Sequence, residues 1–110
     1  MDAIKNYGKL NLGPLLNPRS IAFVGATTKP DVAGNDMLLE VLLSGYKGRI
    51  YCVNPKYDTV EGIKCYPSLS DLPETVDLAV LAIGNARLET QLKEAIKLGV
   101  GSAVLFGSAF

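Results

Sequence analysis

Apolar residues gather in four short runs along the chain, at residues 21–26, 49–53, 78–83 and 102–106. Each run is nearly continuous and does not alternate apolar with polar positions. Short continuous runs are typical of strands whose two faces are both covered, as in a parallel sheet between layers of helix. The pattern therefore predicts four buried strands of such a sheet.

The segment between the first two runs has the spacing of an amphipathic helix over residues 36–44. Asn35 is expected to cap the start of this helix, and Gly45 to end it, because these residue types favour those positions. Its predicted core-facing positions are Met37, Leu38, Val41 and Leu42.

A second helix is predicted over residues 87–98, where it is ended by Gly99. An ion pair between Glu89 and Lys93, four positions apart, is expected to support it. Its predicted core-facing positions are Leu88, Leu92, Ala95 and Ile96.

Shorter elements complete the predicted pattern. After a tight turn, residues 63–66 are expected to form an extra strand, and residues 68–73 to hold one helical turn. Residues 12–20 are predicted to form a turn or short helix on the edge of the fold, and residues 1–11 to form a flexible lead-in.

Strands and helices alternate, so the predicted fold class is α/β with right-handed crossovers. We expect a Rossmann-like, doubly wound, mainly parallel sheet in the order 3-2-1-4-5, with the short strand around Cys65 at one edge and with truncation at the C-terminus. Ligands of such sheets bind at the carboxyl ends of the strands, near the switch between strands 1 and 4. In this chain those ends are residues 25–28, 54–57, 84–86 and 107–109.

The chain has 110 residues, which fits one domain, and its 11 basic and 11 acidic residues cancel. This balance argues against a nucleic-acid surface. The longest uncharged stretch, residues 98–110, is shorter than the about 20 residues that span a bilayer, so no membrane association is expected. Two cysteines without a secretory signal favour reduced thiols in the cytoplasm.

The chain contains no histidine, which removes the commonest general base, the commonest metal ligand and any phosphohistidine. Cys52 and Cys65 do not form a C-x-x-C pair, so we expect no metal site. The chain also has no G-x-S-x-G nucleophile elbow. No catalytic residue is therefore predicted.

The stretch FVGATTKPDVAGND, residues 23–36, lies where a phosphate-binding loop would join the first strand to the first helix. A glycine at the strand end suits a tight turn close to a ligand, and the small or hydroxylated residues after it can donate hydrogen bonds to phosphate. Ordinary turn, capping and solvent-exposed roles are the alternatives for these positions. The candidate phosphate-binding residues are Gly25, Ala26, Thr27, Thr28 and Lys29.

This loop is not the G-x-G-x-x-G fingerprint of NAD sites, because Gly34 follows Gly25 by nine positions. The second strand ends in Asn54, Pro55 and Lys56, where NAD sites carry an acid that holds the ribose hydroxyls. A lysine there suits an additional phosphate, either the 2′-phosphate of NADP or the 3′-phosphate of coenzyme A. Pro55 offers a flat apolar face for adenine, although a rigid turn would also explain it.

Two further strand ends complete the predicted site. The third long strand ends in Ile83, Gly84 and Asn85. Gly84 lets a ligand approach the backbone, and Asn85 either caps the next helix or forms a hydrogen bond with a ligand. Gly107 and Ser108 follow the last predicted strand and place further small residues at the same edge of the sheet.

Several segments together resemble a known family: LLNPRSIAFVGATTKP, residues 15–30, and GYKGRIYCVNPKYDTVEGIKCYPSLSDLPETVDLAVLAI, residues 45–83. The ordered motifs N-P-[KR]-S-[IV]-A, V-G-A, V-N-P-K-Y, G-x-K-C-Y-P-S and D-L-A-V carry the resemblance. Over residues 12–110 the chain is similar to the N-terminal coenzyme A-binding domain of NDP-forming acyl-CoA synthetases. These include the ADP-forming acetate–CoA ligases, and they are similar to the alpha subunit of succinyl-CoA synthetase.

The resemblance implies a role for each strand end. It implies that Gly25–Lys29 contact the phosphates of coenzyme A and that Asn54–Lys56 meet its adenosine 3′-phosphate end. It also implies that Ile83–Asn85 line the path of the adenine or the pantetheine, and that Gly107 and Ser108 lie close to the pantetheine arm. The sequence departs from the family where relatives often carry proline in place of Gly84, and where they often continue S-A-G-F instead of residues 107–110.

Enzymes of this family use a phosphohistidine on a following domain and a separate ATP-grasp module. By resemblance, this chain is therefore expected to be a fragment of a longer synthetase, which binds coenzyme A or acyl-CoA and does not catalyse alone. Those modules would be its partners, in cis or as a subunit. The implied parent reaction converts a carboxylate, coenzyme A and ATP, or another NTP, to acyl-CoA, the nucleoside diphosphate and phosphate.

Two other functions stay open from the sequence. One is a non-catalytic sensor of coenzyme A or acyl-CoA, which stands alone or is fused to an acetyltransferase. The other is an NADP-binding oxidoreductase domain, which shares the argument from Lys56 and lacks the compact glycine fingerprint.

Overall fold

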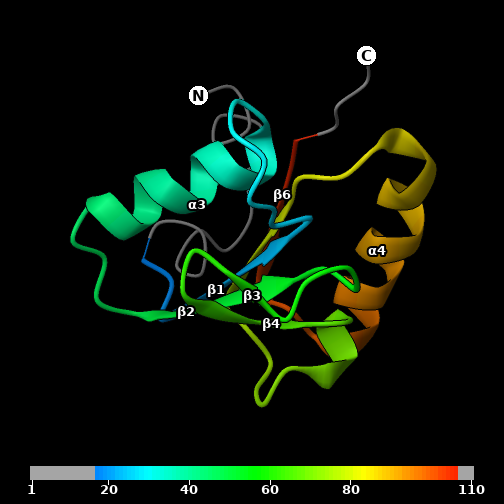
Figure 1. Cartoon of the computed structure of the whole chain (residues 1–110). Coiled ribbons are helices and arrows are strands. Elements are labelled where there is room, and N and C mark those ends of the chain that lie inside the picture. Colours follow the sequence, from blue (N-terminus) through cyan, green and yellow to red (C-terminus); the bar gives the residue numbers. More distant parts are fainter. Residues whose placement is uncertain (1–16, 107–110) are drawn as a thin grey trace.

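A computed structural model describes residues 17–106 and shows a six-stranded sheet with a helix on each face (Figure 1). Each helix directly follows a strand, as expected for an α/β fold. In chain order the elements are β1 (Ser20–Val24), α3 (Ala33–Leu43), β2 (Arg49–Val53), β3 (Thr59–Val60), β4 (Ile63–Tyr66), the 3-10 turn η1 (Leu69–Asp71), β5 (Leu78–Leu81), α4 (Asn85–Leu98) and β6 (Ser102–Leu105).

The strand order is β3-β4-β2-β1-β5-β6, and it confirms the predicted Rossmann-like sheet. It equals the expected order 3-2-1-4-5 with one additional strand, β3, at the edge. All pairings are parallel except β3 with β4, which form an antiparallel hairpin closed by Glu61 (φ 51°) and Gly62 (φ 79°). The two residues of β3 are too few to leave a pattern in the sequence, so it was not predicted.

Strand β1 lies in the middle of the sheet and divides the core into two layers. Its side chains alternate, so that Ile21 and Phe23 pack on the α3 side and Ala22 and Val24 on the α4 side. All five residues of β1 are buried. The continuous apolar run over this strand therefore reflects burial on both faces, as predicted.

Helix α3 begins three residues earlier than predicted, and Asn35 does not cap it. The N-cap residue is Val32, whose carbonyl accepts hydrogen bonds from the Asn35 N–H at 3.0 Å and the Asp36 N–H at 2.9 Å. Asn35 is thus already inside the first turn, and only 4% of it is exposed. The predicted end of the helix is confirmed, because Gly45 follows it with φ +82°.

Helix α4 begins at Asn85, two residues earlier than predicted, and Gly99 ends it in the left-handed conformation with φ +81°. The predicted ion pair between Glu89 and Lys93 is present at 3.2 Å. The expectation that Ile96 faces the core is wrong, because 69% of this residue is exposed. It lies about 100° around the helix from Ala95, which is the buried position of this stripe.

The sequence also predicted features at both ends of the chain. The predicted flexible lead-in over residues 1–11 and most of the predicted turn or helix over residues 12–20 lie outside the described residues. The predicted truncation of the sheet at the C-terminus also concerns residues outside the described range. Within residues 17–106, neither helix is long and apolar enough to cross a membrane.

Candidate binding site at the carboxyl ends of the strands

A small pocket opens at the carboxyl edge of the sheet, where the central strands end. Its volume is about 30 Å³, so it accommodates part of a ligand that would extend across the edge. Four predicted site residues meet in it, from three different strand ends. The lining residues are Val24, Gly25, Val53, Asn54, Pro55, Pro67, Ile83, Arg87 and Gln91.

Gly25 must be glycine for two separate reasons. Its φ is +90°, a left-handed conformation that side chains disfavour. A Cβ atom at this position would also lie 2.2 Å from the backbone oxygen of Ala82, at the end of β5. Its N–H donates to the Val53 carbonyl at 2.9 Å, so the chain crosses directly over the ends of the neighbouring strands.

Gly34 explains the long spacing of the loop. A Cβ atom there would lie 2.1 Å from the carbonyl oxygen of Gly25, so the first turn of α3 packs directly on the end of β1. The residues between these two glycines form the loop that projects from the edge of the sheet. The structure therefore uses two glycines for close packing, without the compact spacing of the NAD fingerprint.

Two side-chain amides hold successive carbonyls of this loop. Asn54 Nδ2 donates to the Ala26 carbonyl at 2.9 Å, and Asn35 Nδ2 donates to the Thr27 carbonyl, also at 2.9 Å. In a planar trans peptide the N–H points opposite to the C=O. The N–H groups of Thr27 and Thr28 are therefore directed away from these two asparagines, and successive N–H groups of this kind can bind an anion.

Asn35 is itself held by the hairpin at the edge of the sheet. Its Nδ2 also donates to Glu61 Oε2 at 2.9 Å, and Glu61 stands in the turn between β3 and β4. This buried side chain was expected to cap α3, and instead it joins the loop to the hairpin. No local sequence pattern predicts this role, because Glu61 is 26 positions away.

Asn54 also shapes the second predicted segment of the site. Its Oδ1 accepts a hydrogen bond from the Lys56 N–H at 2.9 Å, which is an Asx turn. Its own N–H donates to the Tyr66 carbonyl at 2.9 Å. Asn54 thus fixes Pro55 and Lys56 beside the loop, and both of these residues are exposed to solvent.

Tyr57, directly after this turn, contacts the loop through its hydroxyl. Its oxygen lies 2.8 Å from Thr27 Oγ1, in a hydrogen bond in which either hydroxyl can donate. Hydrogen bonds from the side chains of Thr27 and Thr28 lower the pKa of Tyr57, and the charge of Lys29 acts in the same direction. The loop therefore offers an environment that favours negative charge on oxygen.

The remaining predicted site residues have different positions. Thr27, Thr28, Lys29 and Lys56 stand beside the pocket and do not line it. Gly84 is the N-cap residue of α4 with φ −65°, and a Cβ atom there would meet nothing within 4 Å, so the fold does not require glycine at this position. Asn85 is the first residue of α4 and is exposed. Gly107 and Ser108 lie outside the described residues.

Sequence reasoning missed Arg87 and Gln91, which line the pocket from α4. They are four positions apart and lie in the first two turns of the helix that follows β5, so they share one face. The sequence could have indicated Arg87 and Gln91, because they lie on the predicted helix that follows a strand at the switch point. Arg87 adds a third cation to the edge that already holds Lys29 and Lys56.

The potential metal ligands of the described residues do not come together as a group. Among residues 17–106, no group of three or more potential ligands from His, Cys, Asp and Glu comes together. Cys52 and Cys65 are both buried thiols, and burial raises the pKa of each.

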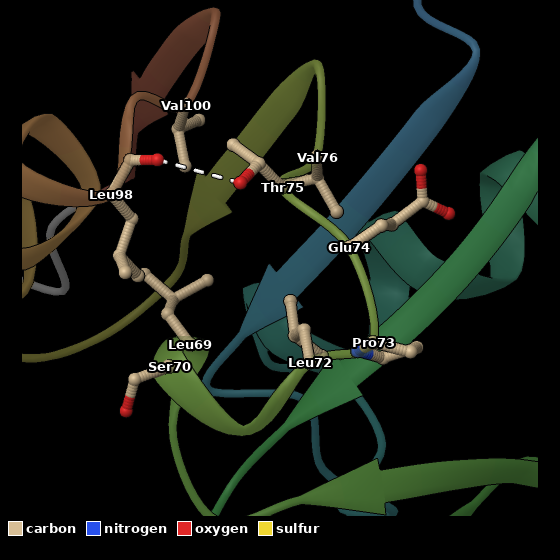
Figure 2. Close-up of a pocket in the computed structure, with 9 residues that line it drawn as sticks. All are labelled: Leu69, Ser70, Leu72, Pro73, Glu74, Thr75, Val76, Leu98 and Val100. Atoms are coloured by element: carbon tan, nitrogen blue, oxygen red, sulfur yellow. Dashed lines mark hydrogen bonds between the residues drawn. The ribbon is translucent and has the colours of Figure 1, made fainter.

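A larger cavity of about 270 Å³ lies at the opposite edge of the sheet (Figure 2). Leu69, Leu72, Val76, Leu98 and Val100 form its apolar walls. Thr75 Oγ1 donates to the Leu98 carbonyl at 3.4 Å, and the carboxylate of Glu74 points away from Leu98 toward Arg49 and Tyr51. No cation lines this cavity, so it is poorly suited to a phosphorylated ligand.

Known proteins share this domain. A relative in Methanocaldococcus jannaschii, an ADP-forming acetate–CoA ligase, is 38% identical over 93 residues, which cover 84% of this chain and 13% of that protein. A solved dinucleotide-forming acetyl-coenzyme A synthetase 1 of Ca. Korarchaeum cryptofilum, in complex with phosphate and ADP, matches with a TM-score of 0.85 and 39% identity. That match covers 91% of this chain and 22% of the synthetase chain.

A shorter neighbour is a conserved hypothetical protein of Pyrococcus furiosus, with a TM-score of 0.72 and 36% identity over 80% of this chain and 74% of that one. In contrast, the chain spans less than a quarter of the length of the curated ligases that it matches. The model of the CoA binding domain family matches residues 19–110. By this match and by its identity to the N-terminal part of ADP-forming acetate–CoA ligases, the chain belongs to the family of CoA-binding domains.

Proposed function

We propose that this chain binds coenzyme A across the carboxyl edge of its sheet and serves as the coenzyme A-binding domain of an NDP-forming acyl-CoA synthetase. One observation carries the proposal. Asn54 and Asn35 hold the carbonyls of Ala26 and Thr27, which directs the N–H groups of Thr27 and Thr28 away from these two side chains, at an edge that also carries the exposed Lys29 and Lys56. This arrangement suits a ligand with several phosphate groups.

Each part of the edge has a proposed role in this complex. The loop from Gly25 to Lys29 receives the diphosphate, and Lys56 meets the 3′-phosphate on the ribose. Pro55 and the neighbouring pocket take the adenine, while Ile83–Asn85 line the path of the pantetheine arm. Gly107 and Ser108 are proposed to lie near that arm, as the resemblance implies.

The chemical steps of the parent enzyme are proposed to take place on other modules. The chain has no histidine to carry a phosphoryl group, so a phosphohistidine domain and an ATP-grasp module would complete the reaction. The proposed reaction forms acyl-CoA, ADP and phosphate from a carboxylate, coenzyme A and ATP. The buried thiols Cys52 and Cys65 suit a reducing compartment, for which we propose the cytoplasm.

Thermal-shift measurements with four ligands test the proposal. Coenzyme A should raise the melting temperature most, 3′-dephospho-CoA less, and NAD little, because only coenzyme A offers the 3′-phosphate to Lys56. A larger shift with NADP than with coenzyme A would contradict the proposal. Equal shifts with coenzyme A and dephospho-CoA would contradict the role of Lys56 alone.

A matched pair of variants sharpens this test. Lys56→Ala should remove the difference between coenzyme A and dephospho-CoA, whereas Lys47→Ala should keep it. Lys47 precedes β2, so it lies at the opposite edge of the sheet. If the difference between the shifts with coenzyme A and dephospho-CoA disappears equally in both variants, the 3′-phosphate interacts with the overall charge of the chain and not with Lys56.

A non-catalytic sensor of coenzyme A or acyl-CoA is the second candidate. The neighbour from Pyrococcus furiosus favours it, because this chain covers 74% of that protein, which is therefore little longer than one domain. Both candidates share the binding site. They differ in the domains that are encoded with the chain. Phosphohistidine and ATP-grasp domains would favour the synthetase, whereas an acetyltransferase domain, or no further domain, would favour the sensor.

A further inference from the structure

The phosphate loop already presents its donors to a residue of this chain. Thr27 Oγ1 accepts a hydrogen bond from the Lys29 N–H at 3.2 Å, so its own proton is available to the Tyr57 oxygen 2.8 Å away. The Tyr57 oxygen thus engages the Thr27 hydroxyl, a donor that a phosphate oxygen would use.

The position of this oxygen is fixed from both sides. The ring of Tyr57 is half-buried and packs against the core cluster that includes Phe23 and Leu38, so the hydroxyl has little freedom to move away. On the other side, Asn54 and Asn35 hold the carbonyls of the loop. Neither Tyr57 nor the loop can easily shift, so a ligand oxygen has to displace the Tyr57 hydroxyl from the hydroxyl of Thr27.

We infer that Tyr57 sets the affinity of this site, because its hydroxyl competes with a ligand phosphate oxygen for the hydroxyl donor of Thr27. The inference rests on the proposed function, since it assumes that the loop receives the phosphates of coenzyme A. When the ligand binds, the hydroxyl proton of Thr27 turns from the phenol to the phosphate. The phenol then exchanges hydrogen bonds with water.

The variant Tyr57→Phe tests this competition, because it removes the oxygen and keeps the ring in the core. Its dissociation constant for coenzyme A, measured by calorimetry, should be about two- to tenfold lower than that of the wild type, the range of one hydrogen bond. Tyr66→Phe is the matched control. Its ring packs edge-on against Tyr51 at 6.1 Å between centroids, and its affinity should not change.

An affinity of Tyr57→Phe that equals the wild type would overturn the inference. A weaker affinity would show that the hydroxyl contacts the ligand directly, and it would overturn the inference as well. The tyrosine ring signals in NMR supply a second readout that needs no ligand. In Thr27→Val the pKa of Tyr57 should rise toward that of an ordinary tyrosine, and an unchanged pKa would contradict the hydrogen bond on which the inference depends.

Inorganic pyrophosphate separates this inference from the proposed function. If the wild type binds pyrophosphate and not coenzyme A, the proposed function is wrong, and the comparison of Tyr57→Phe with wild type in pyrophosphate still decides the role of Tyr57. If coenzyme A binds and Tyr57→Phe does not tighten either ligand, the inference fails and the proposed function stands. If neither anion binds either protein, both are wrong.

Discussion

At the scale of single residues, both the fold and the proposed site depend on the absence of a Cβ atom at Gly25. Gly25→Ala would place a Cβ 2.2 Å from the Ala82 oxygen and would also force φ +90° on a side-chain residue. Left-handed strain alone amounts to about 1–2 kcal/mol, and the clash adds to it. We expect urea unfolding to show a loss of stability of at least about 2 kcal/mol, together with weaker coenzyme A binding.

Gly45→Ala is the matched control for this prediction. Gly45 has nearly the same φ, +82°, but a Cβ there would meet nothing within 4 Å. The control should show the conformational penalty without the clash, and its binding should be unchanged. Equal losses in the two variants would mean that the contact with β5 does not constrain the site.

The carboxylate of Glu74 makes the stability of the fold depend on pH. Hydrogen bonds from Arg49, and next from the Tyr51 hydroxyl, lower the pKa of Glu74 to about 2 from its ordinary 4.5. A lowered pKa in the folded state means that this stabilisation is present above about pH 5 and is lost as the pH falls toward 2. Unfolding free energies measured across this range should therefore fall less steeply in Glu74→Gln than in the wild type.

The expected difference is small, because 58% of the Arg49 side chain is exposed and solvent screens the pair. Glu89→Gln serves as the control. Its partner Lys93 is 74% exposed, and this variant should show the pH dependence of the wild type. An identical pH dependence in Glu74→Gln and the wild type would mean that the ion pair contributes nothing to stability.

At the scale of elements, helix α3 places very similar side chains in opposite surroundings. Leu38 is fully buried against β1, whereas 85% of Leu43 is exposed. Leu38→Ala should destabilise the protein by about 2–5 kcal/mol, because it removes buried methyl groups and leaves a cavity. Leu43→Ala should stay within about 0.5 kcal/mol of the wild type in chemical unfolding. Comparable losses would show that another surface covers the outer face of α3 in solution.

The elements were largely predictable, and the contacts between them were not. The strands and the ends of both helices leave local signals, namely continuous apolar runs and the glycines at positions 45 and 99. Asn35 was misassigned as a cap because its partner, Glu61, is 26 positions away, and Tyr57 meets Thr27 across 30 positions. Side chains that act across the fold leave no periodic signal, so this part of the site needed the structure.

At the scale of the whole molecule, the sheet separates two kinds of surface. The carboxyl edge holds the glycine contacts, the asparagine amides and the cations Lys29, Lys56 and Arg87, whereas the amino edge holds a cavity that no cation lines. Strand β1 joins the two helical layers between these edges. Because the loop donors are fixed to β2, α3 and the β3–β4 hairpin, ligand binding at the carboxyl edge should stabilise the sheet as one unit.

The reactivity of the Cys52 thiol tests whether the sheet opens as one unit. Cys52 lies in β2 with no exposed surface, and burial raises its pKa to about 12, so the native protein should protect it from Ellman's reagent at pH 8. In a Cys65→Ala background, the reaction should therefore require opening of the sheet. Saturating acetyl-CoA, whose blocked sulfur does not consume the reagent, should slow the reaction by a factor of one plus the ligand concentration over its dissociation constant.

The control reaction is the same variant in denaturing urea, where the thiol should react at once with or without acetyl-CoA. Rapid modification in native buffer would show that β2 opens without unfolding of the rest of the sheet. A slow reaction that acetyl-CoA leaves unchanged at saturation would mean that the ligand binds the opened form as well as the closed one. In that case the carboxyl edge would not be coupled to the core, contrary to the contacts of Gly25 and Asn54 with the ends of β2, β4 and β5.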